Sequence, residues 1–182
     1  FLYNPEYYLH FLCRDRGLIA MLMLIFRIKD HWYALEATHV VEIVPRIPLR
    51  EVPSGQPYLA GFLNYRGTIV PIIDLARLIE QQTSCTHLST RIIMIQYQVP
   101  QDSRLCHLGL IAEQVTETLN PATREIRPLN LDSPRSDYLG GMLLDDRGMI
   151  QCIDLDKLFS FLRSENALPA LQGAAPALPM PT

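Results

Sequence analysis

The sequence has few cysteines and no excess of basic residues, and both shortages exclude classes of protein. Sixteen basic and 19 acidic residues give the 182-residue chain a formal net charge of −3. A nucleic-acid-binding protein needs surplus Lys and Arg to neutralise phosphates, so we expect no nucleic acid as a partner. The four cysteines, Cys13, Cys85, Cys106 and Cys152, have no Cys-x-x-Cys spacing. Scattered cysteines in an acidic chain are typical of a reduced, cytosolic protein.

Long hydrophobic runs are also missing. The longest apolar run, residues 18–26, has nine residues, whereas a membrane-spanning helix needs about 20. No basic stretch opens the chain and no small-residue cleavage site follows the run, so it does not resemble a signal peptide. We therefore expect a buried strand here and no direct insertion into a membrane.

The sequence contains no recognisable catalytic or cofactor motif either. There is no Gly-x-Ser-x-Gly, and the Gly-Gly dipeptide at Gly140 is too short for a phosphate-binding loop. Cys85 with His87, and Cys106 with His107, could each supply two metal ligands. Structural zinc sites normally show ligand pairs about two to four residues apart, twice over. We predict that the protein is not an enzyme and holds no cofactor and no metal.

What the sequence does contain is a series of short apolar runs rich in β-branched residues. Such runs between turn signals are the signature of β-strands. The expected strands are residues 22–28, 32–37, 69–73, 91–97, 105–112, 142–144 and 149–153. Two runs are followed by apolar residues at helical spacing, directly after Asp74 and Asp154. Each aspartate stands where a helix needs an N-cap acceptor, so two short helices are predicted.

The chain also contains an internal repeat. Four residues of the first half recur in the second half 75 positions later: Leu35, Ala37, Val40 and Glu42 as Leu110, Ala112, Val115 and Glu117. Tyr58, the Arg66-Gly67 dipeptide and the Ile73-Asp74-Leu75 tripeptide recur 80 or 81 positions later. The common order is strand, short turn of helix, strand, glycine, hairpin with an Arg-Gly turn, strand and Asp-capped helix. Four matches in one order indicate two copies of one unit.

A unit of this size buries too little surface to be very stable alone. Packing two units together, or closing each into a small barrel, removes exposed sheet edges. We therefore predict a mainly β fold in which two small β-barrel subdomains with short helices pack together, with a groove between them. The expected domain is residues 21–163, with intertwined halves 21–80 and 91–163. Residues 1–20 would be an N-terminal extension, and 164–182 a flexible Ala/Pro-rich tail, with a proline-rich ligand for another domain as the alternative.

Residues 61–75, from Gly61 through Asn64, Arg66 and Gly67 to Leu75, resemble the Gly-x-x-Asn-x-Arg-Gly-x-Ile-x-Pro-Val-x-Asp-Leu run of the CheW family of chemosensory adaptors. Further resemblances lie at residues 33–44, 109–128 and 138–155, in the family's order. The resemblance implies two five-stranded barrels. It also implies a non-catalytic adaptor that links a chemoreceptor's cytoplasmic tip to the regulatory domain of a CheA-type histidine kinase.

Such an adaptor would be cytoplasmic, at membrane-bound receptor arrays, with other CheW-like domains as further candidate partners. Two alternatives stay open: a related scaffold for pilus-based twitching motility, and a β-barrel protein that binds a small ligand between its lobes.

The resemblance places the receptor-binding surface at the first Arg-Gly turn. It implies that Arg66 contacts the receptor, and the amphipathic ring of Tyr65 is suited to the same interface. Asn64 and Gly67 are expected to shape the turn, Asn64 through a bond to its own backbone and Gly67 through a positive φ. The alternative for Arg66 is a solvated turn charge.

Two residues of the preceding segment complete this predicted site. We expect Glu42 to pair with Arg66 and orient its guanidinium, with an ordinary surface acid as the alternative. Val40 either contacts the receptor or packs in the core. The second turn, at Arg147, is preceded by Asp145 and Asp146, which would neutralise it, so we interpret that turn as structural.

Overall fold

The computed structural model describes residues 22–51, 56–98, 105–120 and 137–165. Along these residues, nine strands, one 3-10 turn and two short helices follow each other. They are β1 (Met23–Ile28), β2 (His31–Glu36), η1 (Ala37–His39), β3 (Val40–Pro45), β4 (Leu59–Tyr65), β5 (Thr68–Asp74), α2 (Leu75–Ile79), β6 (Arg91–Gln98), β7 (Leu105–Leu119), β8 (Leu139–Asp145), β9 (Gly148–Ile153) and α3 (Leu155–Ser164). The mainly β class with short helices is therefore confirmed.

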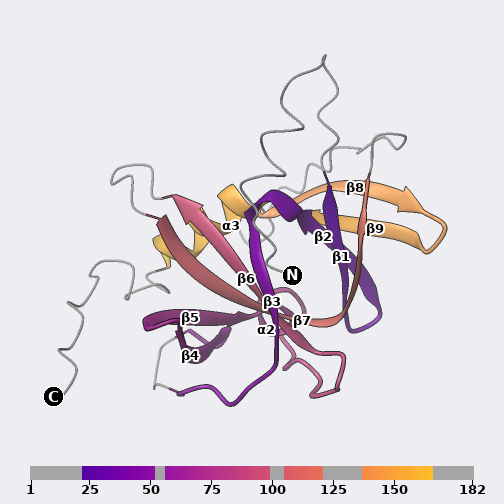
Figure 1. Cartoon of the computed structure of the whole chain (residues 1–182). Coiled ribbons are helices and arrows are strands. Elements are labelled where there is room, and N and C mark those ends of the chain that lie inside the picture. The colour runs from indigo at the N-terminus through magenta and orange to yellow at the C-terminus, as the bar shows by residue number, and fades with distance from the viewer. Residues whose placement is uncertain (1–21, 52–55, 99–104, 121–136, 166–182) are drawn as a thin grey trace, which may run out of the picture.

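Strand β7 is shared by two five-stranded sheets (Figure 1). Its first part, residues 105–112, pairs with β6 and with β5, and these strands continue to β3 and β4 in the order β3-β6-β7-β5-β4. Its second part, residues 113–119, pairs with β1 in the order β7-β1-β2-β9-β8. We call these the first and the second sheet.

The repeat predicted from the sequence exchanges strands between its two copies. In the second sheet Leu35 of β2 lies opposite Ile153 of β9, and in the first sheet Leu110 of β7 lies opposite Ile73 of β5. Leu35 and Leu110 are repeat equivalents, as are Ile73 and Ile153, and both pairings are parallel. Each sheet is therefore built from both halves of the sequence.

One contact reaches across the outer strands of the first sheet. After β3 the chain arrives at Arg50, which forms an isolated antiparallel bridge with Phe62 of β4. The two residues exchange main-chain hydrogen bonds of 3.0 and 2.9 Å. This bridge joins the segment after β3 to β4, the outer strand at the other end of the first sheet's strand order.

The predicted turn of helix exists in one copy of the repeat and was wrong for the other. η1 spans Ala37–His39, but its equivalents, residues 112–114, lie inside β7. There Gln114 takes a φ of 46°, and the register between β1 and β7 shifts nearby. In β7 this local irregularity stands at the place that η1 occupies in the first copy. Strand β7 continues to Leu119, seven residues beyond its predicted end at residue 112.

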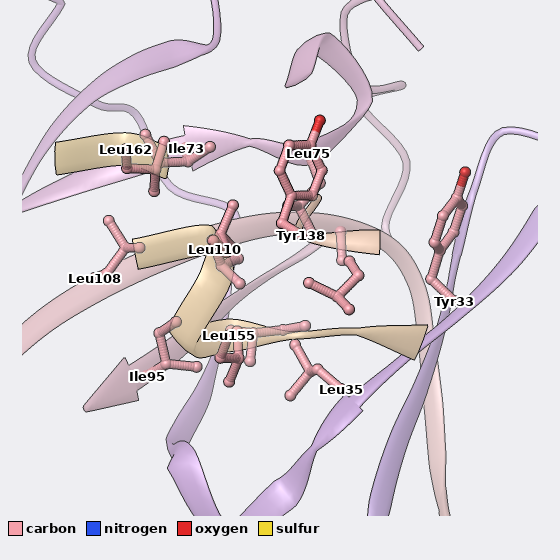
Figure 2. Close-up of a cluster of buried hydrophobic side chains, with 14 of the residues drawn as sticks. Tyr33, Leu35, Ile73, Leu75, Ile95, Leu108, Leu110, Tyr138, Leu155 and Leu162 are labelled. Atoms are coloured by element: carbon pink, nitrogen blue, oxygen red, sulfur yellow. The ribbon is translucent and has the colours of Figure 1, made fainter. Parts of the chain in front are cut away.

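The main hydrophobic core lies between the two sheets and is completed by the helices (Figure 2). Leu35 of β2, Leu110 of β7 and Leu155 of α3 are at most 4% exposed and face one another there. Smaller clusters fill the space inside the second sheet, around Ile150, and inside the first, around Ile92. Burial of apolar surface at about 25 cal/mol per Å² makes these clusters the main stabilising feature.

Both predicted helix caps are present. Asp74 accepts from the main-chain N–H groups of Ala76 and Arg77, and Asp154 accepts from that of Lys157. Helix α3 extends to Ser164, one residue into the segment predicted as a tail. Residues 1–20 and 166–182, for which an extension and a flexible tail were predicted, lie outside the described residues. Neither described helix is long and apolar enough to cross a membrane.

Candidate functional site

The predicted site forms around the β4–β5 turn. Arg66 and Gly67 both have positive φ, 51° and 85°, as the two central residues of a type I′ hairpin turn require. The main-chain N–H of Gly67 donates to Asn64 Oδ1 at 2.9 Å. This is the contact expected of an asparagine that shapes the turn, and it places the Arg66 side chain at the tip of the hairpin.

Glu42 joins this turn to β3, an outer strand of the first sheet. Its Oε2 accepts from Tyr65 Oη at 2.7 Å and from Arg66 Nη2 at 3.0 Å. The guanidinium also lies 5.1 Å from the centre of the Tyr65 ring, a cation–π distance. Three of the four predicted receptor-binding residues therefore form one cluster.

Exposure differs sharply within this cluster. The Arg66 side chain is 72% exposed and that of Glu42 40%, whereas Tyr65 is 9% exposed. Burial, and then the Glu42 carboxylate, raises the pKa of Tyr65 above its usual value. The Tyr65 hydroxyl is therefore a protonated donor at neutral pH, and it holds Glu42 in position beneath an accessible guanidinium.

Val40 is set apart from the cluster. The register of β3 shifts between Val40 and Glu42, and half-buried Val40 packs against the core between the sheets. This contact is the core-packing alternative considered for it.

Sequence reasoning considered His107 of β7 only as a metal ligand and missed its place beside Tyr65. Its ring centroid lies 5.7 Å from that of Tyr65. Burial, and then the charge of Arg66, lowers the pKa of His107 below 6.5, so the imidazole is neutral at pH 7. The repeat contained a signal for this residue, because His107 lies 75 positions after Trp32 and is therefore its repeat equivalent. The Trp32 ring lies beside Arg147 of the second turn.

The second sheet carries a copy of the site. Arg147 forms an ion pair with Glu117 of β7. Arg66 forms the corresponding ion pair with Glu42, the repeat equivalent of Glu117. Its guanidinium lies 5.5 Å from the centre of the Trp32 ring and 3.9 Å from Asp145. The expected neutralisation by the turn's own acids is thus only partial. The Arg147 side chain is 29% exposed, so it is less exposed than that of Arg66.

The described residues offer little for metal or thiol chemistry. They contain no group of three or more His, Cys, Asp or Glu side chains arranged to hold a metal ion. Cys152, predicted to be a core thiol, is 7% exposed, and burial raises its pKa to about 11. A thiol with so high a pKa is a poor nucleophile.

Comparison with known proteins gives consistent results. Residues 22–163 match the model of the CheW-like domain family. The chain is 33% identical over 156 residues to the probable chemotaxis protein CheW of Rhizobium etli, covering 84% of this chain and 93% of the relative. It is 24% identical over 149 residues to the chemotaxis protein CheW of Bacillus subtilis, covering 81% and 92%.

A solved structure shares the fold. The crystal structure of the scaffolding protein TtCheW from Thermoanaerobacter tengcongensis superposes with a TM-score of 0.62 at 22% identity. The match covers 78% of this chain and 89% of that protein.

Proposed function

Since the chain belongs to the CheW-like family, we propose that it is a non-catalytic adaptor that links the cytoplasmic tip of a chemoreceptor to the regulatory domain of a CheA-type histidine kinase. The adaptor would work in the cytoplasm at membrane-bound receptor arrays, and other CheW-like domains are further candidate partners. Membership of a family whose named relatives are chemotaxis and scaffolding proteins supports this role.

The receptor-binding part of this proposal rests on the guanidinium of Arg66, which is accessible and is already oriented by its neighbours. Arg66 has five N–H donors, and Glu42 and the Tyr65 ring hold the group from below. An exposed ion pair contributes only about 0 to 1 kcal/mol to folding. The stability of the fold therefore does not explain why Glu42 and Arg66 are paired. Ordering a flexible side chain at an interface costs about 0.5 to 1.5 kcal/mol. The contact to Glu42 lowers that cost before a partner arrives.

The chemistry of the partner follows from the open face of the arginine. A forked, permanently charged donor suits a carboxylate or a pair of main-chain carbonyls. On the receptor we therefore expect an acidic or carbonyl-bearing surface to meet Arg66, with the edge of Tyr65 as the apolar border of the contact.

A sedimentation assay tests the proposal. This chain, a receptor signalling-tip fragment and a CheA-type kinase from the same source are combined and centrifuged, with the wild-type chain or with Arg66→Glu. We expect the kinase to sediment with receptor and wild-type chain, and more than tenfold weaker recruitment with Arg66→Glu. Arg163→Glu is the matched control, because Arg163 is also exposed but lies on α3.

Two outcomes would contradict the proposal. If the wild-type chain leaves kinase and receptor in solution, array coupling is wrong. If Arg66→Glu and Arg163→Glu recruit the kinase equally well, the adaptor role stands but the receptor surface lies elsewhere.

A further inference from the structure

A cavity of about 830 Å³ opens between α2 and α3, away from the Arg66 turn. Its wall includes Tyr58, Leu78, Tyr138, Leu139, Phe161 and Glu165. Tyr58 and Tyr138 are repeat equivalents, and their carbonyls accept from the N–H groups of Asp74 and Asp154 at 2.8 and 2.9 Å. The repeat therefore brings two tyrosines to one cavity, each anchored at the start of a helix.

The wall of this cavity is aromatic, and one of its residues, Tyr58, has a hydroxyl without a partner among the described residues. The Phe161 ring lies 6.2 Å from that of Tyr58 and 5.3 Å from that of Tyr138, measured between centroids. Tyr58 is 7% exposed, and its hydroxyl has no hydrogen-bond partner within the described part of the chain. Burial raises the pKa of Tyr58 to about 12, so the hydroxyl remains a donor. Aromatic grooves with such donors are typical sites for extended, proline-containing peptides, whose carbonyls are free.

The last described residue lies at the rim of this cavity, and the sequence that follows it is rich in proline. Helix α3 ends at its C-cap Glu165, which lines the cavity, and Gln56 Nε2 donates to the Glu165 carbonyl at 2.7 Å. The 17 residues that follow, 166–182, contain no charged side chain and four prolines. Leu168, Pro169 and Leu171 come within six residues of the rim.

We propose that residues 167–171 of this chain dock in the cavity between α2 and α3 as an extended proline-containing segment, and that Tyr58 donates to one of its main-chain carbonyls. A segment tethered this closely has an effective concentration in the millimolar range. At that concentration even a site of low affinity is occupied. Its lack of charge fits the aromatic wall, and the charged members of the lining, Arg77 and Glu165, are not required to contact it. The inference is independent of receptor binding.

Photo-cross-linking of the full chain tests the location. Leu171 is replaced by p-benzoylphenylalanine, and the dilute protein is irradiated, digested and analysed by mass spectrometry. We expect cross-links within one chain to peptides that carry Tyr58, Leu78 or Phe161. The control places the same group at Leu88, which is 96% exposed and does not line the cavity. Cross-links only between two chains, or the same products from both positions, would overturn the proposal.

Amide hydrogen exchange supplies a second readout. In the wild-type chain we expect residues 168, 170 and 171 to exchange at least tenfold more slowly than an unstructured peptide. Leu78→Glu, which places a charge on the wall, should abolish this protection, whereas Leu88→Glu should keep it. Circular dichroism verifies that both variants are folded. Wild-type exchange at the unstructured rate, or equal protection in the two variants, would contradict docking.

Discussion

At the scale of single residues, two equivalent arginines differ in their surroundings and in their exposure. Arg66 and Arg147 both occupy an Arg-Gly turn and both pair with an equivalent glutamate. The Trp32 ring lies beside Arg147, whereas the repeat equivalent of Trp32, the smaller His107, lies against the Tyr65 ring. The indole contributes to covering Arg147, while the guanidinium of Arg66 stays in solvent. The difference supports a binding role for Arg66 and a structural one for Arg147.

Replacement of Glu42 by glutamine should weaken receptor binding without unfolding the protein. Glutamine keeps an acceptor for the Tyr65 hydroxyl but loses the charge that orients Arg66. We expect receptor affinity to fall about three- to tenfold, which corresponds to about 0.7 to 1.4 kcal/mol. The melting temperature should stay within about 2 °C, because the ion pair is exposed. Titration with receptor fragments measures the affinity, and an unchanged affinity would rule out the orienting role.

At the scale of elements, the two equivalent aspartates that cap the helices differ in their burial and in the number of main-chain groups they bind. Asp74 is 1% exposed, and besides the α2 cap it accepts from the main-chain N–H of Ser84 at 3.1 Å. The Asp154 side chain is 37% exposed and accepts only the Lys157 N–H among the main-chain donors described. One carboxylate ties a loop to the core, whereas the other caps a helix at the surface.

Alanine substitutions should expose this difference. Asp74→Ala leaves buried N–H groups without an acceptor, at about 1 to 3 kcal/mol each, so we expect a loss of about 2 kcal/mol or more. Asp154→Ala should cost about 1 kcal/mol or less, as for an ordinary cap. Urea denaturation of the two variants measures both values. Equal losses would show that the Ser84 contact contributes nothing.

A buried carboxylate on β7 connects this strand to two other segments and makes the stability depend on pH. Glu113 of β7 accepts from the main-chain N–H groups of Lys29, in the β1–β2 turn, and Cys85, in the loop after α2, at 3.0 and 2.6 Å. Burial alone would raise the pKa of Glu113. The two donors and the Lys29 charge outweigh burial and hold this pKa below its usual 4.5.

The sign of the pH effect follows from this depressed pKa. Between the folded and unfolded pKa values the unfolded chain binds more protons, so stability rises with pH. The contribution of Glu113 is complete above about pH 4.5 and is lost as the pH falls through the folded pKa. The difference in unfolding free energy between wild type and Glu113→Gln should therefore shrink between about pH 6 and pH 3. A constant difference in urea titrations would show that Glu113 is not responsible.

At the scale of the whole molecule, the exchange of strands makes the two sheets dependent on each other. Each sheet contains strands from both copies of the repeat, and β7 belongs to both. Unfolding one sheet would remove β7 from the other and open the core between them. Two structurally similar halves are therefore expected to behave as one cooperative unit.

Conservative core substitutions test this cooperativity. Ile92→Val and Ile150→Val each remove one methylene from a fully buried site, in the first and the second sheet, at about 0.5 to 1.5 kcal/mol. The single tryptophan, Trp32, reports on the second sheet, and circular dichroism reports on the whole chain. Ile92→Val should shift both transitions equally. A Trp32 transition that Ile92→Val leaves unchanged would mean that the sheets unfold separately.

The sequence alone determined the class, the repeat, the helix starts and the composition of the turn at Arg66. These features depend on neighbours in the chain, through alternation of side chains, local capping and the φ preference of glycine, so a linear pattern contains them. Only the tertiary structure decided which copy's strands pair, that β7 continues from the first sheet into the second, and that His107 lies beside Tyr65. It also decided that the Arg66 side chain is more exposed than that of Arg147. Pairing and exposure depend on residues distant in sequence, and the same Arg-Gly dipeptide carries no information about the ring that packs beside it.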